Sequence, residues 1–132
     1  MKNQFTHLDK DGKPGMVDVS EKKTSAREAI ASGQIILGEK IMQALFQGNY
    51  ETKKGSITQT AIIAATMAVK NTYNTIPLCH QIPISSCKVI INPIANGFEI
   101  RCKVKTNSQT GVEMEALHGV SVSALTLSLI HI

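Results

Sequence analysis

The sequence predicts an α+β fold in which helices cover one face of an antiparallel sheet. A strand-like segment at 25–37 precedes two helical segments, which are followed by two strand-like segments and a last helical segment. Apolar and polar residues alternate regularly at 98–105, while the segment at 57–72 is rich in alanine, as expected for a helix packed closely on a sheet. Strands and helices in this order pack as a sheet with a helical layer.

The first segment, 25–37, can be interpreted in two ways. The run Ser25-Ala26-Arg27-Glu28 is similar to a helix capping box, which favours a helix. Against this, apolar or small residues recur at every second position, which favours a strand. These residues are Ala29, Ala31, Gly33, Ile35 and Leu37. We expect the strand, because a glycine also sits in the middle of the run.

Two helices are predicted next. Glu39 to Gln47 places Ile41, Met42 and Leu45 on one face, and Gly48 follows as a stop signal. The second helix runs from Ile57 to about Thr72. Pro77 prevents its continuation.

The remaining elements are two strands and a helix. Ser85–Ile91 and Phe98–Lys105 are joined through Asn96-Gly97, which is a hairpin signal, and we expect a loop longer than the minimal two residues. The second strand should point Phe98, Ile100, Cys102 and Val104 inward, and Glu99, Arg101, Lys103 and Lys105 outward. From Val112 onward the pattern is helical again.

Composition indicates one globular domain, 1–132, with 42% hydrophobic and 18% charged residues. The net charge of +4 suits an anionic ligand but is too small to imply nucleic acid. An RNA-binding sheet would need aromatic stacking platforms, and the predicted sheet offers Phe98 alone. We therefore expect no nucleic-acid partner.

The cysteines and the chain ends bear on the compartment. The 3 cysteines are 8 and 15 residues apart, which fits neither a disulfide framework nor a zinc pattern, and we expect the cytoplasm and no metal site. Lys2 and Asp9 interrupt any early apolar run, so no signal peptide is expected. The apolar tail from Val120 is too short for a bilayer, so no membrane partner is expected.

Three groups of residues could carry chemistry. Lys53-Lys54-Gly55-Ser56 precedes a helix, where backbone N–H groups and Lys54 could bind phosphate, although two such lysines can also be simply solvated. His80 could be a general acid or base with Cys79 packed beside it, or only a hydrogen-bonded histidine at a helix exit. Glu113 and Glu115 fall in a first helical turn, a position that the helix dipole favours anyway. Cys102 is expected to be an inert core residue, and Cys87 has no assigned role.

Taken together, these stretches resemble the MoaC family of cyclic pyranopterin monophosphate synthases. The resemblance is collinear from residue 5 to about 126, and Pro77-Leu78-Cys79-His80 with Thr110-Gly111-Val112-Glu113-Met114-Glu115-Ala116-Leu117 is its most specific part. It also includes Phe5-Thr6-His7-Leu8-Asp9, Met16-Val17-Asp18-Val19-Ser20, Arg27-Glu28-Ala29, Lys54-Gly55 and Val122-Ser123-Ala124-Leu125-Thr126.

The resemblance implies a ferredoxin-like α+β fold and dimers that build a hexamer, with the active site at a subunit interface. It implies a lyase of molybdenum-cofactor biosynthesis that converts 3',8-cyclo-7,8-dihydro-GTP to cyclic pyranopterin monophosphate, releases pyrophosphate and needs no cofactor. Lys54 and His80 are then the catalytic candidates. The residues expected to bind substrate are Arg27, Leu78, Cys79, His80, Glu113, Met114 and Glu115.

The sequence departs from the family's pattern after Thr126. The family continues with a stretch that carries a catalytic Asp and Lys, whereas residues 116–132 here contain no Asp, Glu, Lys or Arg. This end is expected to be aberrant or truncated, through a frameshift or a boundary of the expressed segment. The alternative function is then a catalytically impaired subunit that binds substrate or oligomerises without turnover.

Overall fold

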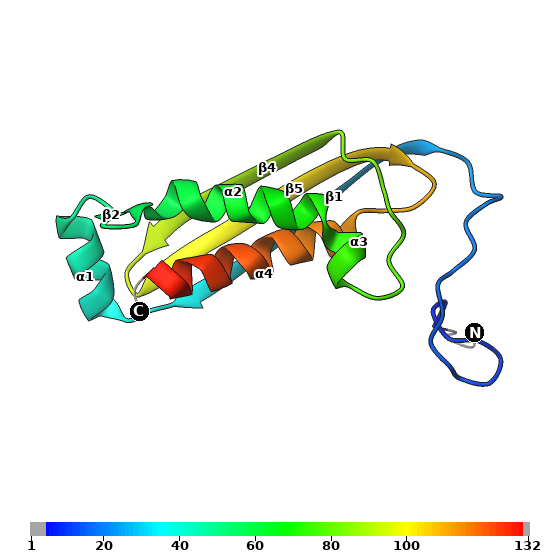
Figure 1. The fold of residues 1–132 in the computed structure, drawn as a ribbon, viewed down its shortest axis with the longest axis horizontal. Coiled ribbons are helices and arrows are strands. Elements are labelled where there is room, and N and C mark those ends of the chain that lie inside the picture. The colour runs from blue at the N-terminus through cyan, green and yellow to red at the C-terminus, as the bar shows by residue number, and fades with distance from the viewer. Residues whose placement is uncertain (1–4, 131–132) are drawn as a thin grey trace.

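The computed structural model describes residues 5–130, so residues 1–4 and the last two residues of the apolar tail lie outside it. β1 (Ser25–Ile36), β4 (Ser86–Ile94) and β5 (Gly97–Ser108) form an antiparallel sheet in the order β1-β5-β4. α2 (Ile57–Lys70) and α4 (Glu113–Ile130) lie side by side on one face of this sheet (Figure 1). The predicted α+β class, with helices on one face of an antiparallel sheet, is confirmed.

The first segment is a strand, as the two-residue alternation predicted. β1 pairs with β5 along its whole length, from Ser25 opposite Ser108 to Ile36 opposite Gly97. Gly33 suits this place because α4 approaches the strand closely: a Cβ there would lie 2.8 Å from Cγ1 of Val120. The similarity to a capping box was therefore misleading, since a short local motif does not outweigh twelve paired residues.

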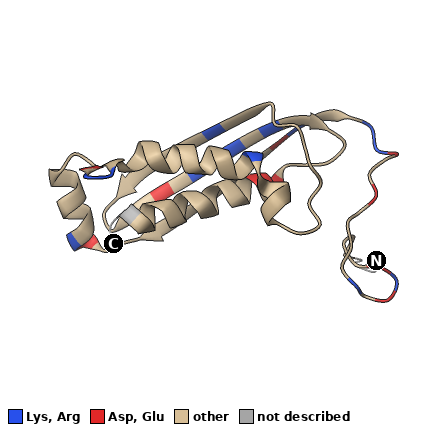
Figure 2. Cartoon of the chain, viewed as in Figure 1, with Lys and Arg blue, Asp and Glu red and all other residues tan. Residues whose placement is uncertain are grey.

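The central strand confirms the predicted alternation of buried and exposed residues. The four inward side chains of β5 are fully buried: Phe98, Ile100, Cys102 and Val104. On the outward face, Nζ of Lys103 and Nζ of Lys105 lie 3.4 and 3.8 Å from carboxylate oxygens of Glu28 on β1. Charged residues lie along the strands but are sparse along α2 and α4 (Figure 2).

The turn between β4 and β5 is tighter than expected. β4 extends to Ile94, so only Ala95 and Asn96 connect the strands, and the expectation of a longer loop is wrong. Gly97 is required where the ribbon turns, because a Cβ on it would collide with the carbonyl oxygen of Ile35 on the neighbouring strand. The pairing of the strands, which no local pattern specifies, sets this loop length.

The first two helices match their predicted bounds except at the C-terminal end of the second. α1 (Glu39–Gln47) buries Met42 and is followed by Gly48. A short hairpin that the sequence did not predict, β2 (Glu51–Thr52) and β3 (Gly55–Ser56), then leads into α2. α2 ends at Lys70, and a single further turn, α3 (Thr72–Thr75), completes the segment predicted as one helix.

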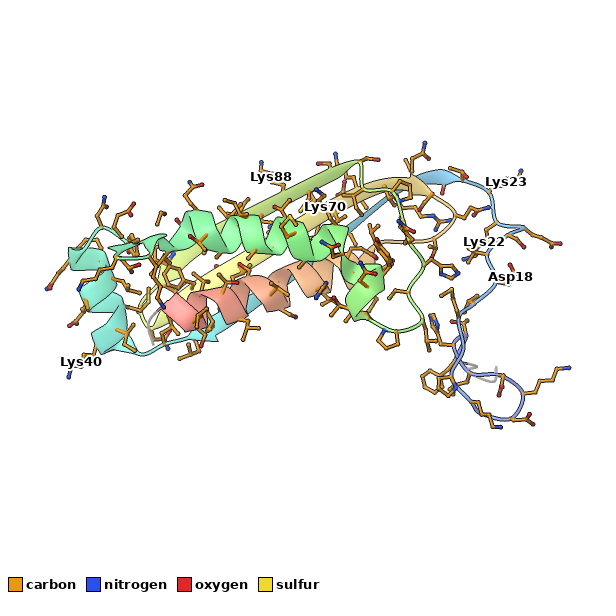
Figure 3. All side chains as sticks on the ribbon, in the orientation of Figure 1. Asp18, Lys22, Lys23, Lys40, Lys70 and Lys88 are labelled. Atoms are coloured by element: carbon orange, nitrogen blue, oxygen red, sulfur yellow. The ribbon has the colours of Figure 1, made fainter. Side chains whose placement is uncertain are left out.

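The molecule therefore has two distinct ends. α1 and the start of α2 lie at one end, whereas α3 and the N-terminal segment lie at the other (Figure 1). Lys40 lies at the α1 end, and Asp18, Lys22 and Lys23 lie at the α3 end (Figure 3). The N-terminal segment contains a turn near Asp9, whose Oδ1 accepts hydrogen bonds from the backbone N–H groups of Asp11 and Lys13.

Candidate functional site

The segment after α3 has an unusual backbone. Pro77 lacks an amide hydrogen and so cannot extend the helix, and the next residue, Leu78, has a φ of 67°. Positive φ is unfavourable for a residue with a branched side chain. The backbone conformation therefore needs support from its surroundings, and it directs the chain into Cys79 and His80, which are both half-buried.

The chain after His80 is attached to the sheet. The Thr106 hydroxyl on β5 donates a hydrogen bond to the carbonyl oxygen of Pro83, at 2.5 Å, and the Ser85 amide donates to the carbonyl of Lys105, at 2.8 Å. Thr106 is only 3% exposed, so the first of these bonds is shielded from water. The segment 78–85 is thus fixed beside the end of β5 that leads to α4.

Glu115 provides the buried acid of the site. It lies in the first turn of α4 and its residue is only 5% exposed. Burial raises the pKa of its carboxyl group above the ordinary value of 4.5, the nearby charge of Glu113 raises it further, and a backbone hydrogen bond opposes the shift. Such a carboxyl group can hold a proton to higher pH than an ordinary glutamate can.

The segments 78–82 and 110–115 face each other across a cavity of about 120 Å³. Six of the eight residues predicted for the site line it: Leu78, Cys79, His80, Glu113, Met114 and Glu115. They come from segments more than thirty positions apart in the chain. The structure therefore brings together the two motifs that the sequence singled out.

Cys79 is not placed as a thiolate nucleophile. Burial raises the pKa of its thiol above the ordinary value, and the negative charge of Glu115 raises it further. A thiol becomes nucleophilic when its pKa is lowered by a cation or a helix N-terminus. Cys79 therefore lines the cavity as a neutral thiol beside His80.

His80 lies between two cavities. Besides the first, it lines a second of about 280 Å³ with Val19, Thr24 and the chain at 107–110. The charge of His80 also makes a small contribution to lowering the pKa of Asp18, after the larger contribution of hydrogen bonds from Ser20. The N-terminal segment thus passes beside His80, which is the one predicted catalytic residue in contact with both spaces.

Arg27 flanks the second cavity instead of lining the first. Its Nε donates a hydrogen bond to the carbonyl oxygen of Ser108 at 3.3 Å, and its Nη2 donates to the carbonyl of Gln109 at 3.4 Å. These bonds direct the half-buried guanidinium toward the chain that enters α4. Arg27 is therefore near the site but is held by backbone groups.

Lys54 lies at the other end of the molecule. It occupies the exposed turn between β2 and β3, immediately before α2, whereas the cavity lies beyond the end of that helix. α2 has 14 residues, which at 1.5 Å per residue separates the two places by about 21 Å. Within one chain, Lys54 does not meet the other site residues.

Sequence reasoning missed several residues of the site. His7, Ile82, Thr110 and Gly111 also line the first cavity. A side chain on Gly111 would collide with the Glu113 carboxylate, so glycine leaves room for that group. His7 and Gly111 both lie in stretches that resemble the MoaC family. Their place in those stretches was the only sequence signal that could have assigned them to the site.

A third cavity, of about 410 Å³, is lined by Ile82 together with residues outside the predicted site. Cys87 on β4 lines it with Thr66 and Lys70 of α2. A hydrogen bond from the Cys102 thiol lowers the pKa of Cys87 to about 7, against the effect of burial, and a bond from Thr66 also lowers it. The same hydrogen bond and burial raise the pKa of Cys102, which is fully buried.

Two kinds of feature are absent from residues 5–130. This part of the chain holds no group of three His, Cys, Asp or Glu side chains that could bind a metal ion. None of its helices is both long and apolar enough to cross a membrane.

The fold and site define an α+β domain with a cavity, lined by titratable side chains, at the junction of its sheet and helices. The MoaC family matches residues 16–128. The chain belongs to this family.

Named relatives agree with this assignment. A cyclic pyranopterin monophosphate synthase of Helicobacter hepaticus is 48% identical over 126 residues, covering 94% of this chain and 78% of its own length. The synthase of Xanthomonas axonopodis pv. citri is 45% identical over 125 residues, covering 94% and 76%. A molybdenum cofactor biosynthesis bifunctional protein of Synechocystis sp. is 48% identical over 128 residues, and this chain spans 37% of its length.

Proposed function

We propose that this chain acts in molybdenum-cofactor biosynthesis as a cyclic pyranopterin monophosphate synthase, a cytoplasmic lyase built as one domain. The substrate is 3',8-cyclo-7,8-dihydro-GTP, and the products are cyclic pyranopterin monophosphate and pyrophosphate. One observation carries the proposal: His80, Cys79 and Glu115 line one cavity in a chain 45% identical or more to named synthases. The reaction requires proton transfers around a purine-derived ring, for which such groups are suited.

His80 is the proposed general acid or base. It borders both cavities, so one part of the substrate can occupy the space beside Glu115 while another occupies the space beside Val19. Because its pKa is raised, the Glu115 carboxyl group holds a proton to higher pH than an ordinary glutamate does, and in that form it can donate a hydrogen bond to the ring. Leu78, Met114 and the neutral Cys79 thiol supply the remaining walls.

Two cations are proposed to bind the triphosphate. Arg27 is close to the second cavity through its bonds to the carbonyls of Ser108 and Gln109. Lys54 lies about 21 Å away along α2 of its own chain, and so we propose that a second copy brings its own Lys54 to the cavity. The active unit is then a homodimer, and dimers assemble into a hexamer.

The shared site can be tested by mixing two inactive variants. Lys54→Ala and His80→Ala proteins are each expected to have little turnover of the purified upstream product. If the site takes Lys54 from one chain and His80 from another, mixed dimers contain one intact site, and mixing after subunit exchange should restore up to a quarter of the native activity. No recovery, in a mixture that mass spectrometry shows to be mixed, would rule out the shared site.

Phosphate binding by Lys54 has a separate test. Lys54→Ala should weaken binding of a triphosphate analogue in a calorimetric titration, because loss of a charge-assisted contact costs about 1.5–3 kcal/mol. Its melting temperature should stay close to that of the native protein, since the side chain is exposed. Lys53→Ala, the adjacent lysine, is the matched control. Equal dissociation constants for all three proteins would remove Lys54 from the phosphate site.

A further inference from the structure

The carbonyl oxygen of Ala68, near the end of α2, accepts several hydrogen bonds, including one from α3 and one from α4. The last carbonyls of a helix have no partner within it and must be satisfied from elsewhere. The carbonyl oxygen of Ala68 accepts from the Thr72 hydroxyl at 2.9 Å and from the Asn71 amide at 3.1 Å. It also lies 3.0 Å from Nδ1 of His118, on α4. α4 thus caps the end of α2 through a side chain.

The partners define where the protons lie. A carbonyl oxygen can only accept, so Nδ1 of His118 must carry a proton to bond that of Ala68. The Thr72 hydroxyl oxygen is 3.1 Å from the same nitrogen, so the N–H group is shared between this oxygen and the carbonyl of Ala68 in a bifurcated hydrogen bond. The Thr72 hydroxyl donates its own proton to the Ala68 carbonyl. Thr72 is 1% exposed, so water cannot replace a bond lost there.

This cluster lies where the two halves of the candidate site join. His118 follows Glu115 by one helical turn on α4. Thr72 is the first residue of α3, and α3 leads directly into the segment Leu78–His80. α3, which leads into Leu78–His80, is therefore joined to α4, which carries Glu115, a few residues from the cavity.

The backbone at Leu78 needs such a support. Its φ of 67° lies in the left-handed region, which a residue with a side chain occupies only when its surroundings hold it there. On the downstream side, Thr106 and Ser85 attach the chain to β5. On the upstream side, Thr72 is the buried polar anchor, at 1% exposure.

We propose that His118 and Thr72 are positioning residues, which hold Leu78–His80 in place against Glu115 by fastening the end of α2 to α4. The proposal rests on the proposed function for its activity readout. It predicts that losing the His118–Thr72–Ala68 hydrogen bonds displaces His80 without removing any group that touches substrate. Small displacements of a catalytic group can lower the rate by about 10²-fold.

Four variants test the proposal. His118→Ala and Thr72→Val should lower kcat about ten- to hundredfold, with KM changed less than about threefold, because binding groups stay present while the acid–base group is misplaced. His118→Asn should recover most of the rate, since its amide can donate where Nδ1 did. Thr66→Val is the control: the Thr66 hydroxyl also donates to a carbonyl four residues back, that of Ile62 at 2.9 Å, but within residues 5–130 it forms no hydrogen bond with α4.

The double variant Thr72→Val/His118→Ala gives a further criterion. Both changes break one cluster, so the double variant should be little slower than the slower single variant. Effects on kcat that multiply would mean that the two residues act independently, and would overturn the proposal. So would Thr66→Val slowing the enzyme as much as Thr72→Val does.

Hydrogen exchange, measured without substrate, separates this inference from the proposed function. In His118→Ala the amides of 78–82 should exchange at least about tenfold faster, while those in the middle of α2 stay unchanged. Unchanged exchange at 78–82, or equal acceleration throughout both helices, would overturn the positioning role. If the native protein shows no turnover, the proposed function fails, and the exchange result still decides the role of His118.

Discussion

Replacing Glu115 with glutamine should remove a pH-dependent loss of stability. The glutamate is 5% exposed, and burial raises its pKa above 4.5, its value in the unfolded chain. The folded protein therefore binds this proton more tightly than the unfolded chain does. Stability is unaffected below pH 4.5, where both states are protonated, and falls as pH rises from there to the folded pKa.

The size of the effect follows from linkage. Within that window one carboxyl group can change the free energy of unfolding by up to about 1.4 kcal/mol per pH unit. With an unfolding entropy of about 2.1 cal/mol/K per residue, a chain of 132 residues shifts its melting temperature by about 5 °C for that energy. Glutamine has nearly the same shape as glutamate and does not titrate. The Glu115→Gln protein therefore does not lose stability in this way as pH rises.

Thermal melts of both proteins at pH 4, 5, 6 and 7 measure the difference. Glu115→Gln should melt near the native protein at pH 4 and above it at pH 7, with the gap opening between those values. Glu113→Gln is the matched control, because this neighbouring glutamate is exposed and its replacement should open a much smaller gap. A gap of the same size at every pH would refute the argument that burial shifts the proton affinity of Glu115.

Three further outcomes are expected. His80→Ala should lower kcat about 10²–10⁴-fold with a smaller change in KM, measured by steady-state turnover of the upstream product; a few-fold change would make His80 structural. Gly119→Ala should lower the free energy of unfolding by about 1–3 kcal/mol in a denaturant melt, because a Cβ there would lie 2.8 Å from Sγ of Cys102. The rate at which iodoacetamide modifies Cys87 should be half its maximum near pH 7, and Cys87 should react before the buried Cys102, as followed by peptide mass spectrometry. Equal rates for the two thiols would contradict this.

Much of the fold could be predicted from neighbouring residues. The alternation at 98–105 assigned the buried and exposed faces of β5 correctly, because successive side chains of a strand point to opposite sides. Pro77 marked the end of the helical segment because it lacks an amide hydrogen. The hairpin β2–β3 was missed because each of its strands has only two residues, too few for a periodic signal.

The sequence predicted most residues of the candidate site but not how they lie relative to one another. Resemblance to a family singled out 77–80 and 110–117, and six of the eight proposed residues meet in one cavity. The same resemblance placed Lys54 in the site, although α2 separates it from the cavity within one chain. No local pattern indicated that His7 from the N-terminal segment would join them.

The sequence by itself determined the residue types and the local periodicities: the alternating strand β5, the alanine-rich α2, and titratable groups at the ends of elements. Only the tertiary structure decided that Glu115 is buried beside Cys79, and that His118 meets Thr72 across 46 residues. The physical reason is range. A turn of helix or a pleat depends on residues a few positions apart, whereas burial and proton affinity depend on which distant segments the sheet register brings together.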